Sequence, residues 1–166
     1  MIRYSLKRSC ESQRDLTDIR RMTGLEMCDL KLKDLQPSQF CISEKKLSDI
    51  GRWFEPADLS GFDPVPVKIL NGIPVMTDGH TRAVAAVLAG LDTVPIVLDE
   101  DDLDWDMYLA CVKACRERNI FSPYDLITEI VPEEEYTLKW DRWCDIMQAE
   151  ILLNRKQSIF PVREDE

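Results

Sequence analysis

The sequence predicts an α/β fold, a small mixed sheet with packed helices. An apolar strand, a turn and an Ala-rich helix follow one another over residues 75–90, and a second apolar strand follows at 93–98. Alternating apolar residues at 28–35 are typical of an earlier strand. Asn71-Gly72, between two short apolar runs, is a hairpin signal. Because strands alternate with helical patterns, we expect helices packed on one sheet.

The other elements are predicted around this centre. Gly79 can take backbone angles that a side chain forbids, and Asp78 or Thr77 can accept the free N–H groups of the next helical turn. Gly90 is placed to end that helix. A helix start carries unpaired N–H groups and the positive end of the dipole. The turn therefore suits a phosphate or a carboxylate.

Three more polar residues crowd the same turn. Arg82 could give a forked contact to an oxyanion, His80 is the only histidine of the chain, and Thr81 adds a hydroxyl. Anion binding is one interpretation of this cluster. The other is an ordinary capped core helix with a solvated arginine.

The ordered set of residues resembles the ParB/sulfiredoxin-like superfamily. The pattern there is a strand, Asp-Gly-His-His-Arg or a close variant, a helix ending in Leu-Gly, and a strand that begins at a proline. The matching residues here are Asp-Gly-His-Thr-Arg at 78–82, Gly-Leu at 90–91 and Val-Pro-Ile-Val at 94–97, with the opening strand and proline turn at 30–37 and the hairpin at 66–76. The resemblance implies a core at 28–99, an N-terminal helical extension at 1–27 and a mainly helical C-terminal extension at 100–166.

The resemblance also implies a function. Its members include partition proteins that bind nucleotide and DNA, sulfiredoxins and free-serine kinases, and we expect a bacterial protein. Carried over, Gly79, His80, Thr81 and Arg82 bind the phosphates of a nucleotide (ATP, ADP or CTP), together with Mg²⁺.

Two positions depart from the enzymes of this superfamily. The catalytic cysteine of sulfiredoxins is replaced by His80, and the glutamate that serves as the proposed base of the kinases is replaced by Gln39. A glutamine cannot take a proton, so Asp78 becomes the candidate catalytic base or magnesium contact. Two classes of function stay open. One is a phosphotransferase that acts on a small-molecule acceptor, and the other is a non-catalytic nucleotide-sensing or partition-type module that works through a partner.

Composition limits these classes. The net charge is −10, from 21 basic and 31 acidic residues, which counts against direct DNA binding while leaving room for a local basic face. No stretch has the apolar length of a membrane span, and the N-terminus lacks the apolar core of a signal peptide, so we expect a cytoplasmic protein. The six cysteines have no CxxC pair and are predicted to be reduced thiols, mostly buried.

Further helices are predicted on both sides of the turn. A helix at 15–22 lies in the N-terminal extension. Another begins after Ser43 as its N-cap, runs through about Phe54, and turns Leu47, Ile50, Trp53 and Phe54 to the core.

The acidic run at 99–106 has two interpretations. It could hold a divalent metal, or it is a solvated loop in which Asp102 or Asp104 caps a helix at 105–118. Further on, the sequence predicts a strand at 126–131 and a long helix at 132–154. That helix carries an apolar stripe, which is read as core packing or as a homodimer interface. The stripe consists of Tyr136, Trp140, Trp143, Met147 and Ile151.

Overall fold

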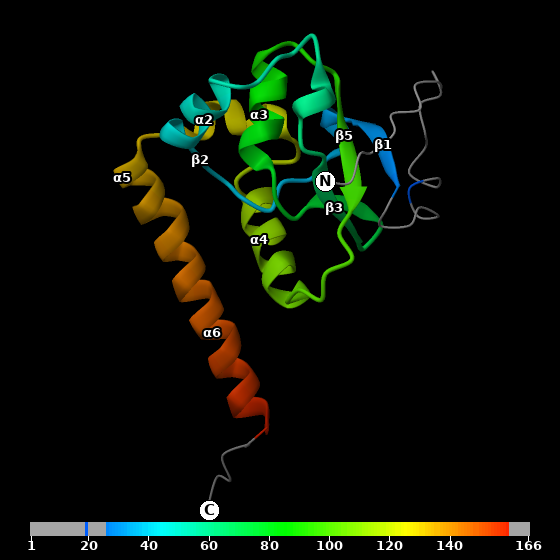
Figure 1. Ribbon diagram of the computed structural model, residues 1–166. Coiled ribbons are helices and arrows are strands. Elements are labelled where there is room, and N and C mark those ends of the chain that lie inside the picture. The colour runs from blue at the N-terminus through cyan, green and yellow to red at the C-terminus, as the bar shows by residue number, and fades with distance from the viewer. Residues whose placement is uncertain (1–18, 20–25, 160–166) are drawn as a thin grey trace, which may run out of the picture.

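The four-stranded sheet has the strand order β1-β5-β3-β4 (Figure 1). Its strands are β1 (Met27–Lys31), β3 (Val65–Leu70), β4 (Ile73–Met76) and β5 (Thr93–Leu98). β5 runs parallel to β3, whereas the β1–β5 and β3–β4 pairs are antiparallel. The predicted mixed sheet with packed helices is confirmed.

This computed structural model describes Ile19 and residues 26–159. Ile19 is helical and buried in the core beside the sheet. The rest of the helix predicted at 15–22 lies outside the described residues. None of the described helices is both long and apolar enough to cross a lipid bilayer.

The hairpin is built as the sequence predicts, but the first strand is shorter. Asn71 and Gly72 join β3 to β4 with positive φ angles of 50° and 79°. The strand predicted at 28–35 ends at Lys31, and a 3₁₀ turn follows over Leu32–Asp34. Leu32, in this turn, is still fully buried, so the alternation of apolar and polar residues continues past the end of the strand. The alternation alone therefore could not show where the strand ends.

The helix after the central turn, α3 (His80–Leu88), lies between two apolar clusters. Ala83, Ala86 and Val87 belong to the cluster against the sheet, and Val84 belongs to the cluster under the C-terminal helices. The prediction of a helix buried on most sides is confirmed. Gly90, at φ +80°, follows its end as predicted.

Two further helices begin with side-chain caps. Ser43 caps α2 (Glu44–Gly51) by accepting the Lys46 N–H. The helix ends before Phe54, however, and Trp53 is 49% exposed, so the prediction that Trp53 faces the core is wrong. After β5 comes α4 (Trp105–Glu117), whose N-cap Asp104 accepts the Met107 N–H with its side chain.

The C-terminal part is helical but differs from the prediction near its start. The strand predicted at 126–131 is wrong except for β6 (Ile130–Val131), which pairs in parallel with β2 (Ile42–Ser43). Residues Pro123–Glu129 form a 3₁₀ helix in which Leu126 is fully buried. An apolar run of this length is compatible with either structure.

A single helical run then closes the described chain. It consists of α5 (Glu133–Tyr136), a π-helical turn over Thr137–Asp141, and α6 (Arg142–Ile159), which extends away from the sheet (Figure 1). The helix predicted at 132–154 is confirmed. Its stripe packs against Phe40 through Trp140 and Trp143. A homodimer interface stays a prediction.

Candidate functional site

The turn before α3 leaves the start of that helix open. Gly79 is its N-cap with φ +76°, and among the described residues no side chain caps α3. Asp78 Oδ1 accepts the Gly79 N–H at 2.7 Å, and Thr77 Oγ1 donates to Asp99 Oδ2 at 2.5 Å. The prediction that Asp78 or Thr77 caps the first turn is therefore wrong. The N–H groups of that turn are left for another acceptor.

His80 is held in one tautomer by a residue far away in sequence. The Ser38 N–H donates to His80 Nε2 at 3.0 Å, and His80 is only 5% exposed. Burial lowers the His80 pKa to about 4; Arg82 acts in the same direction and Asp78 against it. The imidazole is thus neutral at pH 7. Because Nε2 accepts a hydrogen bond, the proton lies on Nδ1, for which the described part of the chain offers no acceptor.

These residues line a pocket of about 280 Å³ at the start of α3, which we call the α3 pocket. Its wall is formed by Gln39, Lys46, Asp49, Ile50, Asp78, Gly79, His80, Thr81, Arg82 and Tyr136. The structure therefore brings together all five predicted site residues, Asp78 through Arg82. It adds others from α2, from the segment before β2 and from α5.

Lys46 and Tyr136 are functional candidates that the sequence did not reveal. Lys46 Nζ lies 4.7 Å from the centre of the Tyr136 ring and 3.4 Å from its hydroxyl oxygen. Gln39 Nε2 donates to the same oxygen at 3.1 Å and to the Cys41 carbonyl oxygen at 2.7 Å. The one available signal was Gln39, which stands where the resemblance expects a glutamate.

Arg82 folds back over the turn. Its Nη2 donates to the Pro64 carbonyl oxygen at 3.4 Å, and a Cβ added to Gly79 would lie 2.8 Å from the same nitrogen. Arg82 Nε is buried without a hydrogen-bond partner in the described structure. Glycine is needed at position 79 for its backbone angle and for the space that Arg82 occupies.

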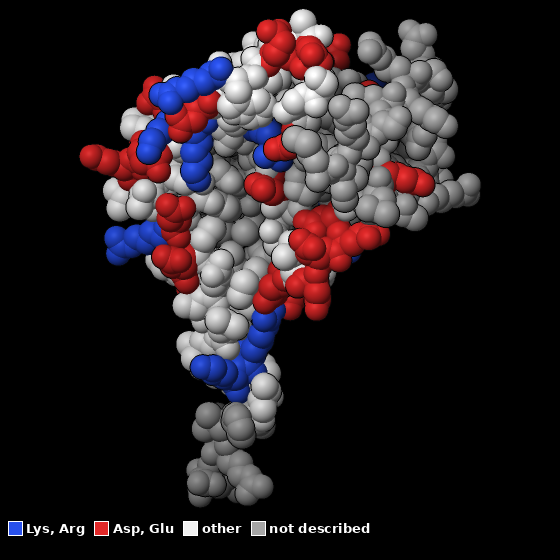
Figure 2. Space-filling view, viewed as in Figure 1, with Lys and Arg blue, Asp and Glu red and all other residues white. Residues whose placement is uncertain are grey.

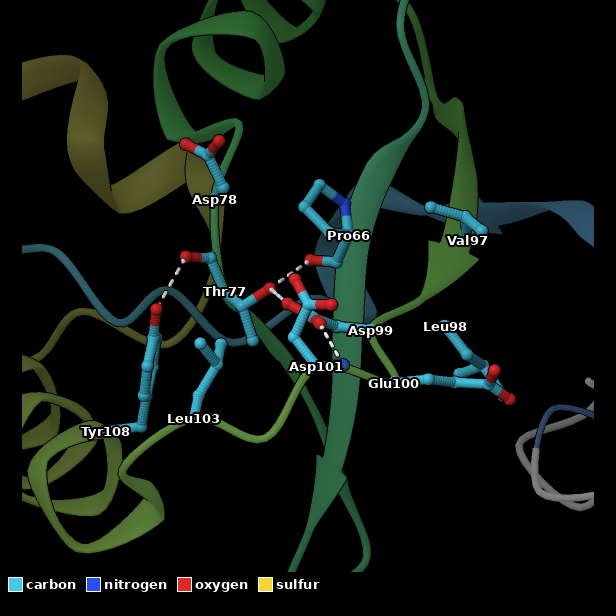
Figure 3. Close-up of a pocket in the computed structure, with 10 residues that line it drawn as sticks. All are labelled: Pro66, Thr77, Asp78, Val97, Leu98, Asp99, Glu100, Asp101, Leu103 and Tyr108. Carbon is cyan, nitrogen blue, oxygen red and sulfur yellow. Dashed lines mark hydrogen bonds between the residues drawn. The ribbon is translucent and has the colours of Figure 1, made fainter. Parts of the chain in front are cut away.

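A second pocket, of about 570 Å³, lies beside the first and is acidic (Figure 3). It is lined by Pro66, Thr77, Asp78, Val97, Leu98, Asp99, Glu100, Asp101, Leu103 and Tyr108. We call it the acidic pocket. Figure 3 shows the Asp78 side chain directed away from Asp99 and Asp101, and Asp78 lines both pockets.

The acidic run gives no sign of a metal site. Within the described ranges, no group of three or more Asp, Glu, His or Cys side chains is arranged to hold a metal ion. Asp104 caps α4, as one of the two predictions has it, and Arg155 of α6 binds its two oxygens at 2.7 and 2.8 Å. Figure 2 shows acidic side chains gathered over the loop from β5 to α4.

No family model matches the sequence, and no curated protein matches it. Solved structures are similar over part of the chain. A protein from Agrobacterium tumefaciens has 19% identity and a TM-score of 0.37, over 59% of this chain and 51% of that chain. Free serine kinase in complex with AMP has 17% identity and a TM-score of 0.37, over 49% and 34%. The C-terminally truncated chromosome-partitioning protein ParB from Caulobacter crescentus, complexed with CTP-gamma-S, has 25% identity and a TM-score of 0.36, over 57% and 53%.

The chain thus spans about half the length of the first and third of these proteins and about a third of the second. At such TM-scores the similarity carries no argument about fold or activity. The order of elements from β1 to β5, with the glycine turn between β4 and α3, follows the pattern described from the sequence. The observed architecture is the small mixed sheet with packed helices that the resemblance implies.

Proposed function

We propose that this chain binds the phosphates of a nucleotide in the α3 pocket. The observation that carries the proposal is the set of hydrogen-bond donors that line this pocket without an acceptor. They include the uncapped N–H groups of the first turn of α3 and the Nδ1–H of His80. A phosphate oxygen accepts such donors, and the positive end of the α3 dipole favours its charge.

The charges of the pocket fit a phosphate that arrives with a cation. Lys46 and Arg82 are its basic residues, and Asp49 and Asp78 are its acidic ones. Mg²⁺ is commonly held by one or two carboxylates together with phosphate oxygens. Asp78 would be the protein ligand of that ion, and Mg²⁺ would supply charge neutralisation between phosphate and carboxylate. The resemblance of the sequence to the ParB/sulfiredoxin-like superfamily supports a nucleotide as the molecule that carries the phosphate.

Lys46 offers the sharpest test of this proposal. Lys46→Gln removes the one α2 cation of the pocket, whereas Lys45→Gln makes the same change on an exposed residue outside it. Thermal unfolding would be followed with ATP, ADP, AMP, CTP and inorganic phosphate, with and without Mg²⁺. A bound ligand at a hundredfold excess over its Kd stabilises the folded state by about 2.7 kcal/mol.

The expected result is a raised midpoint with at least one nucleotide in wild type and in Lys45→Gln. Lys46→Gln should lose at least about tenfold in affinity, because a hydrogen bond to a charged group contributes about 1.5–3 kcal/mol. Absence of any shift in wild type would overturn the proposal. Equal shifts in the two lysine variants would place the ligand elsewhere.

A second candidate function is phosphotransfer to a small-molecule acceptor. The observation that favours it is the position of Asp78, which lines both pockets. A phosphate in the α3 pocket and an acceptor hydroxyl in the acidic pocket would both lie beside this carboxylate, the candidate base. Asp78→Asn should then abolish turnover of ATP or ADP, while nucleotide binding measured without Mg²⁺ persists. A non-catalytic binding module would show no turnover even in wild type.

A further inference from the structure

Tyr136 is the residue of the C-terminal helical run that reaches the α3 pocket. Its side chain is 4% exposed. Two contacts hold the start of α5 in place: Ser43 Oγ donates to Glu133 Oε2 at 2.5 Å, and β2 pairs with β6 just before α5. The phenol is therefore a built part of the pocket wall.

The hydrogen bonds of this phenol leave one proton unused. A tyrosine hydroxyl offers two acceptor positions and one donor. Gln39 Nε2 donates to the oxygen at 3.1 Å and Lys46 Nζ donates to it at 3.4 Å, so both acceptor positions are occupied. No residue in the described ranges accepts the hydroxyl proton. Burial raises the pKa of Tyr136, so the proton is present at neutral pH.

We propose that Tyr136 donates its O–H to the phosphate in the α3 pocket and, through the same oxygen, positions Lys46 beside it. This inference rests on the proposed function. It makes the C-terminal helical run a part of the binding site, so that the ligand is held between α3 and α5. The ligand class is an oxyanion with an acceptor oxygen for the phenol.

The test compares Tyr136→Phe with Tyr124→Phe, using ADP and inorganic pyrophosphate as probes in titration calorimetry. Both variants lose one hydroxyl, but Tyr124 is 40% exposed and lies outside the pocket. Tyr136→Phe keeps the ring under Lys46. We expect binding about tenfold weaker in Tyr136→Phe, from loss of one charge-assisted hydrogen bond, and unchanged in Tyr124→Phe.

A double variant separates donation to the ligand from a purely structural role. Tyr136→Phe combined with Lys46→Gln should still bind more weakly than Lys46→Gln alone, because the phenol contacts the ligand itself. If Tyr136→Phe has no effect in the Lys46→Gln background, the direct contact is wrong. If wild type binds and Tyr136→Phe binds equally well, this inference fails and the proposed function stands. If wild type binds neither these probes nor ATP, AMP or CTP, both fail.

Discussion

The two neighbouring pockets share Asp78 but have opposite chemistry. The α3 pocket is lined by donors, including Lys46 and His80, whereas the acidic pocket is lined by Asp99, Glu100 and Asp101. The difference comes from what each chain segment presents. The α3 pocket is built around the N-terminal N–H groups of a helix. The acidic pocket lies along the carboxylate-rich loop that follows β5. A net charge of −10 is therefore compatible with an anion site, because local geometry decides the chemistry of each pocket.

The largest expected effect is the pH dependence of the free energy of unfolding that His80 causes. Because this histidine is neutral, the α3 pocket is not simply a cluster of cations. Its folded-state pKa of about 4 lies below the ordinary value of 6.5. The unfolded chain therefore binds more protons than the folded chain between these two values. Stability is fully present above pH 6.5, is lost as the pH falls towards 4, and changes no further below that.

The His80 effect is best measured as a difference between two proteins. Urea unfolding at several pH values should show wild type losing roughly 3 kcal/mol more than His80→Gln between pH 7 and pH 4. The glutamine oxygen can still accept the Ser38 N–H, so the fold is retained. Parallel pH profiles for the two proteins would mean that His80 is not held neutral.

The next effect concerns the glycine that shapes the α3 pocket. Gly79 and Gly90 both have positive φ, at +76° and +80°, but only Gly79 lies against Arg82; nothing is within 4 Å of a Cβ at Gly90. Gly90→Ala should lower the free energy of unfolding by about 1 kcal/mol, because alanine is strained at this positive φ. Gly79→Ala should cost about 2 kcal/mol, because the added methyl group also displaces the arginine. Equal values in denaturant unfolding would show that Arg82 does not occupy the observed place.

The smallest effect tests whether the acidic pocket influences its neighbour. Asp101 is exposed and does not line the α3 pocket. Asp101→Asn should change nucleotide affinity by less than about twofold, since exposed charges are screened by salt. A tenfold change measured by calorimetry would mean that the two pockets act as one site.

The sequence predicted the parts of the site that are local. Gly79, His80, Thr81 and Arg82 follow one another in the chain, and a glycine before an apolar helical pattern is enough to place them. Lys46 and Tyr136 are 90 positions apart, so their contact depends on how α2 and α5 pack together. The tautomer of His80 likewise depends on Ser38, 42 positions away.

The fold, like the site, was predictable where it depends on residues that are close together in the sequence. The turn and α3 follow from glycine positions and from an unbroken apolar run. The strand predicted at 126–131 is wrong, because Leu126 lies in a 3₁₀ helix. The apolar run indicates that this segment is buried, and Leu126 is fully buried, but the run does not indicate which secondary structure it adopts. The exposed side of Trp53 was missed because α2 ends at Gly51, before the helical period reaches it.

The central claim is that a phosphate binds at the first turn of α3, and amide NMR tests it most directly. Titration of ¹⁵N-labelled protein with ADP and Mg²⁺ should shift the amide signals of Gly79, His80 and Thr81. The single histidine should show its Nδ1–H signal moving with them, because in the proposed site that proton donates to the phosphate. Saturating shifts confined to these residues and their pocket neighbours are the predicted result. Unchanged signals at α3, with or without shifts elsewhere, would contradict the account.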